Sequence, residues 1–275
     1  MAEAATPARD TGTVEVLQRE DRGPVAVLTL NRPDARNSLS EELLDALARA
    51  FEDIGRSKTL RVVVLAASGS IYCAGHDLKE LTSHRSDTDR GRAYYARIMG
   101  LCSSVMQAIV RCPKPVVAAV QGTATAAGCQ LVASCDLAVA SETATFRTPG
   151  VDIGLFCSTP MVALSRNIGR KRAMQMLLLG EPVDAADAAA MGLVNRVVPA
   201  DRLMAEAMEL AGRIAGKPAA TVAIGKEAFY GQLEMPLAEA YDYAADVMVR
   251  NMLHRDSEEG IGAFLEKRPP DWDDA

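Results

Sequence analysis

Long apolar runs and long basic runs are both absent from this sequence. No stretch approaches the roughly 20 consecutive apolar residues that a membrane-spanning helix requires, so we expect no membrane span. The formal net charge is −6, and the longest run of lysine and arginine is the short segment 170–172. Because nucleic-acid binding depends on neutralising phosphates with basic side chains, this composition argues against a nucleic-acid partner.

Histidine is scarce, and the cysteines are not paired in the sequence. The three histidines (His76, His84 and His254) are scattered, and none of the six cysteines belongs to a C-x-x-C pair. These spacings do not fit an ordinary zinc site. The glycine-rich strings G-x-G-x-x-G and the P-loop, which bind nucleotides, are also missing. The sequence therefore predicts no metal.

The first residues carry neither of the common targeting patterns. Segment 1–10 lacks the apolar core of a secretory signal, and it contains acidic residues that transit peptides usually avoid. On this basis we expect a cytoplasmic protein. Residues 1–12 are small and polar, which favours a disordered N-terminus.

Strands and helices alternate over the first two thirds of the chain, which predicts an α/β fold. Ser40 is expected to be the N-cap of a helix, because a 3–4 spacing of apolar residues follows it. From about residue 199 onward the strand patterns stop and only helical patterns remain. The expected strands are 14–19, 25–30, 61–66, 115–120 and 136–140, and the expected helices are 40–57, 94–110, 203–215, 219–232, 237–253 and 257–266.

Two short segments about fifty residues apart are the most informative part of the chain. They are 72–81 (YCAGHDLKEL) and 122–130 (GTATAAGCQ), and each follows a run rich in valine and opens a predicted helix. A tight turn at a helix start leaves backbone N–H groups without intrahelical partners. Two such turns facing each other would form an oxyanion hole, which stabilises negative charge on a carbonyl oxygen.

These segments, with others in the same order, resemble the enoyl-CoA hydratase/isomerase or crotonase superfamily. The resemblance runs from about Val14 to Arg268. Its other motifs are 30–39 (LNRPDARNSL), 135–140 (CDLAVA) and 259–268 (EGIGAFLEKR). Segments 126–136 and 154–160 are most similar to one branch of that superfamily, called enoyl-CoA hydratase domain-containing protein 3.

The resemblance implies an architecture that periodicity alone does not give. It implies a crotonase-like spiral of ββα units over residues 13–200. It also implies a C-terminal helical region, 201–275, that assembles the chain into a homotrimer or a dimer of trimers. The implied partner is an acyl-CoA thioester, and no cofactor is expected beyond the CoA moiety of that substrate.

The resemblance also assigns roles to particular positions. His76 and Ala127 would contribute the backbone N–H groups of the oxyanion hole. The residues that would contact CoA are Ala35, Arg36, Ala74 and Lys79, together with Phe264 and Lys267 in a tail that closes over CoA, sometimes across a subunit boundary. For the tail residues, ordinary solvated charge and packing are equally good interpretations.

The chain departs from the superfamily at both catalytic glutamates. These positions hold Gln130, which has no proton to exchange near neutral pH, and Gly150, which has no side chain. Asp152 is a candidate substitute, although an exposed loop acid is the preferred interpretation, and Cys157 is expected to be a buried packing residue.

Two further residues near the first segment have structural interpretations. Asp77 and Glu80 form the pattern of a capping box, so capping is preferred to catalysis for both. The imidazole of His76 could reach the acyl group, but a surface side chain without catalytic contacts is the preferred interpretation.

Three functions remain open from the sequence. The first is an acyl-CoA enzyme, nominally an enoyl-CoA hydratase or isomerase of fatty-acid metabolism, with weak standard hydratase activity. The second is an acyl-CoA-binding protein without turnover. The third is a hydrolase or decarboxylase of acyl-CoA, which needs oxyanion stabilisation and only one helper group.

Overall fold

Two β-sheets form the centre of the computed structural model, which describes residues 15–272. The larger sheet has the strand order β1-β2-β3-β5-β7-β10, and the smaller has the order β4-β6-β8-β9. The strands are β1 (Leu17–Arg22), β2 (Val25–Leu30), β3 (Val62–Ala67), β4 (Ile71–Cys73), β5 (Val116–Val120), β6 (Thr123–Thr125), β7 (Leu137–Ser141), β8 (Thr145–Arg147), β9 (Val183–Asp184) and β10 (Arg196–Val198).

The first two strands form the expected antiparallel hairpin. β1 runs to Arg22, and the turn consists of Gly23 and Pro24, with Gly23 at a φ of 59°. The left-handed backbone at Gly23 suits glycine because it has no Cβ to clash. The turn is therefore shorter than the predicted 20–24, and the predicted start of the first strand at Val14 lies outside the described residues.

Residues 62–167 repeat a unit of two strands and a helix. β3, β5 and β7 lie parallel in the larger sheet, and each is followed within a few residues by β4, β6 or β8 of the smaller sheet. A helix then returns the chain. This repeat is the spiral of ββα units that the resemblance implies. Pattern reading alone missed β4, β6 and β8, because strands of three residues are too short to show a period.

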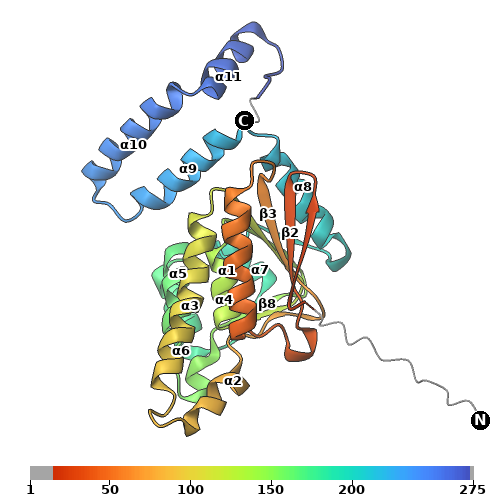
Figure 1. The fold of residues 1–275 in the computed structure, drawn as a ribbon, viewed down its shortest axis with the longest axis vertical. Helices are drawn as coiled ribbons and strands as arrows, with labels where there is room; N and C mark the ends of the chain where they lie inside the picture. The colour runs from red at the N-terminus through yellow and green to blue at the C-terminus, as the bar shows by residue number, and fades with distance from the viewer. Residues whose placement is uncertain (1–14, 273–275) are drawn as a thin grey trace, which may run out of the picture.

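Helices cover both faces of the larger sheet (Figure 1). α1 and α3 pack on one face and α8 on the other, and the valines of β3 alternate between them: Val63 lies in the core on the α1 and α3 side, and Val62 and Val64 in the core beneath α8. The helices are α1 (Glu41–Arg56), α2 (Leu78–Ser83), α3 (Arg92–Arg111), α4 (Ala127–Ser134), α5 (Ser158–Asn167), α6 (Arg170–Leu179), α7 (Ala185–Met191) and α8 (Leu203–Ala215), with the short 3-10 helices η1 (Pro33–Ala35), η2 (His84–Ser86), η3 (Pro149–Ile153) and η4 (Ala200–Arg202).

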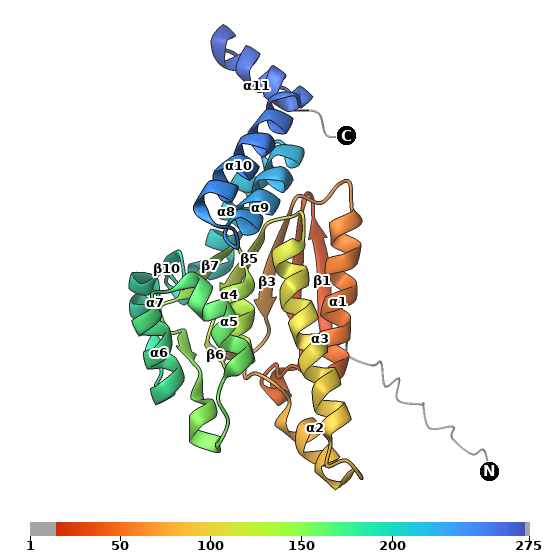
Figure 2. The ribbon, with the colours of Figure 1, turned by 90° about the vertical axis from the view of Figure 1, so that its left-hand side faces the viewer.

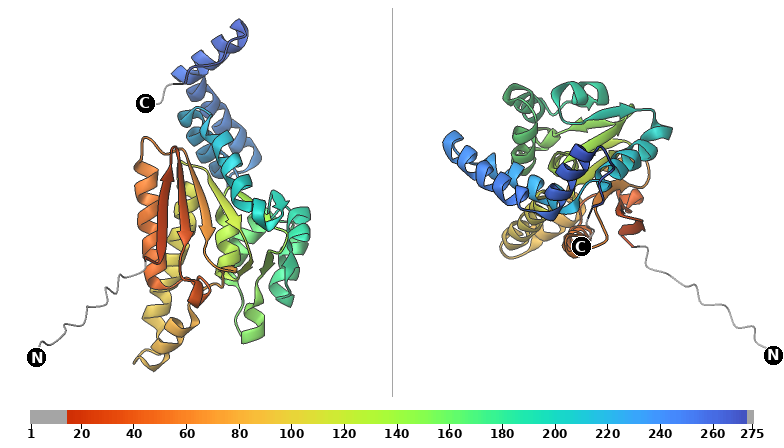
Figure 3. Two further views of the ribbon diagram at one scale, coloured as in Figure 1. Left: turned by 90° about the vertical axis from the view of Figure 1, so that its right-hand side faces the viewer. Right: turned by 90° about the horizontal axis from the view of Figure 1, so that it is seen from above.

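The last three helices project from the sheets as an arm (Figures 2 and 3). They are α9 (Ala219–Gln232), α10 (Leu237–Met252) and α11 (Arg255–Glu266), close to their predicted bounds. α8 was grouped with them in the sequence, but it packs on the sheet through Leu203, Ala207 and Ala211. Among residues 15–272, no helix is long and apolar enough to cross a membrane.

A buried ion pair fastens the arm to the sheets. Lys226 of α9 donates to the Asp136 carboxylate at 2.6 Å and to the carbonyl oxygens of Ile109 and Lys114. Tyr230, one turn later, donates to the same carboxylate at 2.9 Å. Because both partners of the pair are largely buried, removing one would leave an uncompensated charge, so this contact holds the middle of α9 against the end of α3 and the start of β7.

Candidate active site

Three turns lie side by side at one edge of the smaller sheet. β4, β6 and β8 are parallel neighbours, so their carboxyl ends meet at the same edge. The chain leaves them through residues 74–77, 126–128 and 148–150. Topology therefore brings together the two predicted turns and the position of Gly150.

In the first turn, the backbone N–H of His76 points away from the neighbouring segment that contains Leu39. Gly75 accepts a hydrogen bond from the Leu39 N–H at 2.7 Å, and the Asp77 N–H donates to the Leu39 carbonyl at 3.2 Å. These bonds form a parallel bridge between Leu39 and His76. Since the residues on either side of His76 make both bonds, the N–H of His76 itself points the other way.

The second turn contains a strained residue. Ala126 has a φ of 51° and a ψ of −115°, a region that residues with a Cβ rarely occupy. Its N–H is bonded to the Arg147 carbonyl of β8 at 2.9 Å, which holds the turn against the third turn. Ala127 then begins α4, so its N–H has no intrahelical acceptor.

The two turns are in direct contact. A Cβ added to Gly75 would lie 3.0 Å from the Thr125 carbonyl oxygen and 3.4 Å from the Ala127 nitrogen. Within residues 15–272, no backbone acceptor is bonded to the N–H of His76 or of Ala127. The expected pairing of the two turns is therefore present, with both N–H groups left available. Donors arranged in this way stabilise an oxyanion.

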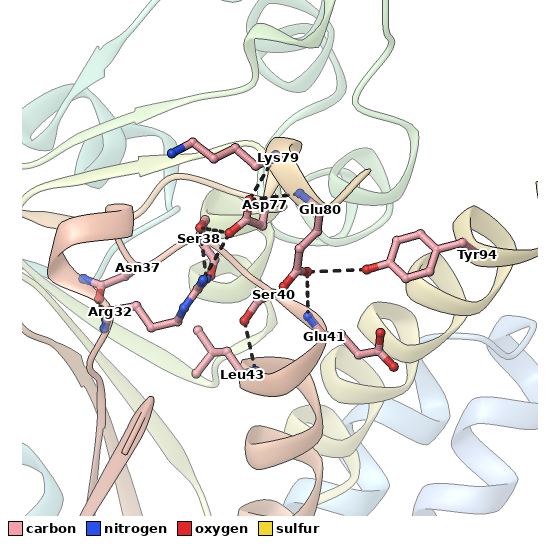
Figure 4. Close-up of polar contacts among 10 residues, drawn as sticks. All are labelled: Arg32, Asn37, Ser38, Ser40, Glu41, Leu43, Asp77, Lys79, Glu80 and Tyr94. Carbon is pink, nitrogen blue, oxygen red and sulfur yellow. Dashed lines mark hydrogen bonds and ion pairs between the residues drawn. The ribbon is translucent and has the colours of Figure 1, made fainter. Parts of the chain in front are cut away.

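A supporting cluster of Arg32, Ser38, Asp77 and Glu80 holds the first turn (Figure 4). The Asp77 carboxylate accepts hydrogen bonds from the Arg32 guanidinium at 3.2 Å and the Ser38 hydroxyl at 3.1 Å. It also accepts the Lys79 N–H at 3.0 Å as the N-cap of α2, as predicted. Burial alone would raise the pKa of Asp77, but these hydrogen bonds outweigh it and lower the pKa. The Asp77 carboxylate therefore uses its hydrogen-bonding capacity to hold the first turn and the start of α2.

Glu80 caps a different helix from the one expected. A capping box would bring its carboxylate back to the N–H of Asp77, but that N–H is bonded to Leu39. Instead, Glu80 accepts the N–H of Glu41, the first residue of α1, at 3.0 Å (Figure 4). Ser40 caps the same helix by accepting the Leu43 N–H. The capping prediction for Glu80 was therefore wrong about the helix, because its partner lies far away in the sequence.

His76 is half-buried and its imidazole is not a surface side chain, so that part of the preferred interpretation was wrong. Both ring nitrogens are buried, and neither has a hydrogen-bond partner in the described part of the chain. Burial lowers the pKa of the ring, so it is neutral near pH 7 and one nitrogen carries a free lone pair.

Gln130, where the resemblance expects the first glutamate, is buried beside the second turn. Gln130 belongs to the first turn of α4 and is 4% exposed. Its side-chain oxygen is buried, and no donor among residues 15–272 reaches it. A neutral acceptor left unpaired in this way can bind a donor from a ligand or a water.

Gly150, where the resemblance expects the second glutamate, has no room for a side chain. A Cβ on Gly150 would lie 2.9 Å from the Leu155 carbonyl oxygen and 3.0 Å from the Cys157 sulfur. The Cys157 thiol occupies that space. Burial raises its pKa, although a hydrogen bond from the Gly150 backbone partly opposes this. Cys157 is thus the buried packing residue that we expected.

The other carboxylate considered near Gly150 is engaged elsewhere. Asp152 lies in η3 with about half of its side chain exposed, and it pairs with Arg147 at 3.1 Å. The same guanidinium donates to the Gly180 carbonyl at the end of α6. The geometry therefore favours an exposed loop acid over a catalytic one.

Three of the residues expected to contact CoA lie together at the first turn. The N–H of Ala74 donates to the Arg36 carbonyl at 3.1 Å, and Ala35 precedes Arg36 at the end of η1. The side chains of Arg36 and Lys79 are exposed. The backbone of residues 35, 36 and 74 thus forms an edge next to the first turn, and two cationic side chains accompany it.

The two tail residues are not brought to this edge within one chain. Phe264 and Lys267 are exposed in and after α11, which lies at the opposite end of the molecule from α2 (Figures 1 and 2). α2 begins directly after the first turn. A contact between the tail and the site would therefore need a second subunit, and it remains a prediction.

Sequence reasoning missed one polar residue at the third turn. Thr148 is 1% exposed, and its hydroxyl has no partner in the part of the chain that the structure describes. We refer to His76, Gln130 and Thr148 as the unpaired group, because each lies in or directly after one of the three turns. In the sequence, the only sign that Thr148 belongs to the site is its position two residues before Gly150. Its burial is visible only in the structure.

Comparisons with known proteins agree with this geometry. The family model described as enoyl-CoA hydratase/isomerase matches residues 20–275. The chain is 44% identical to the mouse protein named enoyl-CoA hydratase domain-containing protein 3, mitochondrial, over 98% of this chain and 88% of that one.

Two solved structures are similar throughout. A crystal structure described as enoyl-CoA hydratase from Mycobacterium smegmatis superimposes with a TM-score of 0.89 and 51% identity, covering 94% of this chain and 98% of that one. Human enoyl-CoA hydratase domain-containing protein 3 gives a TM-score of 0.89 at 45% identity, covering 94% of this chain and 100% of that one. The expected branch is confirmed. The word mitochondrial in the mouse name does not support the expected cytoplasmic location.

Proposed function

The chain belongs to the enoyl-CoA hydratase/isomerase family, and on that premise we propose that it binds acyl-CoA thioesters and polarises their carbonyl group. The observation that carries this proposal is the meeting of the two turns. The N–H groups of His76 and Ala127 have no backbone acceptor within residues 15–272, and Gly75 brings the turns into contact.

A thioester carbonyl suits these donors because negative charge develops on its oxygen when the α-carbon loses a proton or the carbonyl carbon is attacked. Losing one donor of this kind typically costs about 10²–10³-fold in rate. The donors are backbone groups held by the supporting cluster, so they need little rearrangement when the charge develops.

We propose that CoA lies along the edge formed by Ala35, Arg36 and Ala74. The exposed guanidinium of Arg36 and the exposed ammonium of Lys79 supply positive charge for its phosphates. No cofactor beyond this moiety is needed for carbonyl polarisation.

Hydration by the usual family route is expected to be weak. Gln130 cannot exchange a proton near neutral pH, and Gly150 has no side chain and no room for one. Each acid–base group typically contributes about 10²–10⁴-fold, so the nominal role in fatty-acid metabolism as a hydratase or isomerase requires another proton-transfer group.

The same two positions support a second candidate, acyl-CoA binding without turnover. A hydrolase or decarboxylase is the remaining alternative, because such a reaction needs oxyanion stabilisation and one helper group. Consumption of crotonyl-CoA would indicate a hydratase, and release of CoA would indicate a hydrolase. Binding without turnover would show neither. A cytoplasmic location also remains a prediction.

We further propose that the arm assembles the chain into a homotrimer or a dimer of trimers. α9 and α10 enclose an apolar groove of about 420 Å³ that Ile224, Phe229 and Met248 help to line. Leu237, Tyr241 and Leu253 are each more than two thirds exposed in the single chain. Apolar surface of this extent is normally covered by a partner. Sedimentation at micromolar concentration tests this, and a monomer would contradict it.

The binding proposal is tested with a substitution that places an extra side-chain atom between the first and second turns. Gly75→Ala adds a Cβ 3.0 Å from the Thr125 carbonyl oxygen at a φ of 89°. Calorimetry should show butyryl-CoA binding to the unaltered chain and at least about tenfold weaker binding to the variant, which corresponds to roughly 1.4 kcal/mol.

Gly192→Ala is the matched control. Gly192 has the same φ of 89°, but its nearest contact would be 3.8 Å away, at the end of α7. It carries the same backbone strain without separating the turns, so its affinity should be unchanged. No binding of butyryl-CoA or crotonyl-CoA to the unaltered chain at millimolar concentration would refute the proposed function.

A further inference from the structure

The titratable side chains around the three turns differ in whether they are free to accept a proton. Asp77 is bonded to Arg32 and Ser38, and Asp152 is bonded to Arg147. Burial keeps Cys157 protonated by raising the pKa of its thiol. His76 is different, because neither of its ring nitrogens has a partner among residues 15–272.

The imidazole of His76 is also tied to the oxyanion hole by covalent geometry. Its own backbone N–H is one of the two donors, so only a few bonds separate the ring from the carbonyl oxygen that this N–H would bind. The parallel bridge to Leu39 keeps the backbone of His76 extended. In an extended segment the side chain leaves the backbone roughly perpendicular to the plane that contains the N–H, so the ring begins beside the donor that would hold the carbonyl oxygen.

The ring nitrogens of His76 have hydrogen-bonding capacity that no group among residues 15–272 uses. Leaving a buried donor or acceptor unsatisfied is costly, because the group has given up water without gaining a partner. Hydrogen-bonding groups in a folded interior are usually paired, and each exception calls for an explanation such as a catalytic role, a water or an ion. A ring that only filled space in the core would be replaced at lower cost by an apolar side chain.

We propose that the imidazole of His76 is the proton-transfer group of this site and removes and returns a proton at the α-carbon of a bound acyl-CoA. This inference rests on the proposed function, because the carbonyl must first be held by the two N–H groups. The free ring nitrogen forms a bond to the α-proton as the C–H bond breaks. The electron pair of that bond forms the C=C bond of an enolate, and the negative charge moves to the thioester oxygen. The reverse step returns a proton from the ring, so no oxidant or second reactant is needed.

The experiment measures deuterium uptake at the α-carbon of butyryl-CoA in D2O by mass spectrometry. Exchange without protein gives the background rate. The unaltered chain should exchange the α-protons well above that rate. His76→Ala and His76→Gln should each lower exchange about 10²–10⁴-fold, the usual contribution of a general base, while binding butyryl-CoA in calorimetry. Both variants keep the backbone N–H, and glutamine also keeps much of the ring's volume.

His84→Ala is the matched control. His84 lies in η2, where it pairs with Asp87 at 2.8 Å and stacks on Tyr94. Removing this imidazole should leave the exchange rate unchanged. If His84→Ala lowered exchange as much as His76→Ala, the effect would not belong to the turn and the inference would be overturned.

Other outcomes separate this inference from the proposed function. Equal exchange in the unaltered chain and both His76 variants would overturn the inference and leave carbonyl polarisation in place. Butyryl-CoA binding without exchange above background in the unaltered chain would also overturn it, in favour of binding without proton transfer. Absence of binding would refute the proposed function and the inference together.

Discussion

The supporting cluster and the unpaired group lie around the same turns but differ in how their polar atoms are used. In the supporting cluster, Asp77 accepts hydrogen bonds from two side chains and from the backbone of α2, and Glu80 accepts the first N–H of α1. In the unpaired group, His76, Gln130 and Thr148 each have a buried polar atom without a partner among residues 15–272.

This difference separates positioning from chemistry. Paired groups cannot bind a ligand without first giving up an existing contact, whereas unpaired buried groups gain one when a ligand arrives. The supporting cluster therefore explains why the turns hold their shape. The unpaired group indicates where substrate or water would be bound.

The largest effect should come from breaking the packing on which both groups depend. Gly128 of α4 packs directly against Cys73 at the end of β4. A Cβ on Gly128 would lie 2.2 Å from the Cys73 carbonyl oxygen. We expect Gly128→Ala to reduce the free energy of unfolding by about 3 kcal/mol or more, measured by denaturant titration, because backbone atoms must move.

Gly212→Ala tests whether the cause is the contact. Gly212 lies in α8 and has no atom within 4 Å of the added Cβ. Alanine there should be neutral or raise stability by up to about 1 kcal/mol, as helix propensity predicts. Equal stability of the two variants would mean that α4 does not press on β4 as described.

The second largest effect should come from adding charge to the unpaired group. The unaltered chain should hydrate crotonyl-CoA very slowly, and Gln130→Glu should raise the rate on the order of 10²-fold, followed by loss of the enoyl thioester absorbance. The buried, unpaired side-chain oxygen of Gln130 lies where that carboxylate would act.

Gly150→Glu should not add to this gain. Its Cβ would lie 2.9 Å from the Leu155 carbonyl oxygen, so we expect loss of stability instead of restored catalysis. Rapid hydration by the unaltered chain would show that another base already serves the hydratase reaction. A large further gain in hydration rate from Gly150→Glu would show that the third turn can move to accommodate a side chain.

A smaller effect should come from removing the centre of the supporting cluster. Asp77→Ala removes the N-cap of α2 and leaves the Arg32 guanidinium without its carboxylate, so we expect a loss of about 2 kcal/mol in the free energy of unfolding. Asp87→Ala, which removes a carboxylate from the exposed pair with His84, should change stability little.

The Asp77 effect should depend on pH in a defined direction. The pKa of Asp77 is lower in the folded chain than its usual value of about 3.9, so the unfolded chain binds more protons between these two values. Its stabilisation is therefore present above about pH 4 and is lost as the pH falls through the folded pKa. A difference between the unaltered chain and Asp77→Ala that grew on acidification would contradict this.

The smallest effect should be the titration of His76 itself. Burial lowers the pKa of its ring below the usual value of about 6.5, so NMR of the imidazole should show protonation only at more acidic pH. The unfolded chain then binds more protons between the two pKa values, and stability should rise with pH through that window. A ring that titrates at or above the usual value would mean that it is charged and solvated in the folded chain.

Local patterns predicted much of this molecule because they act over a few residues. The bounds of α8 and α9, the N-cap at Ser40 and the helix start after Asp77 all depend on neighbours within one or two turns. The two turns were also visible in the sequence as strings of small residues, and the family resemblance named the positions His76 and Ala127 within them. Neither kind of reasoning indicated that Thr148 is buried, because the burial of a residue just after β8 depends on contacts with other segments.

The sequence by itself determined the alternation of strands and helices and the two turns, since residue identities and their spacing are enough for each. The family resemblance added the expectation that Gln130 and Gly150 stand where relatives carry glutamates. Only the tertiary structure decided that Cys157 fills the space at Gly150, that Glu80 caps α1, and that the nitrogens of His76 are buried without partners. Those three facts depend on contacts between segments far apart in the chain, and such contacts leave no local pattern to read.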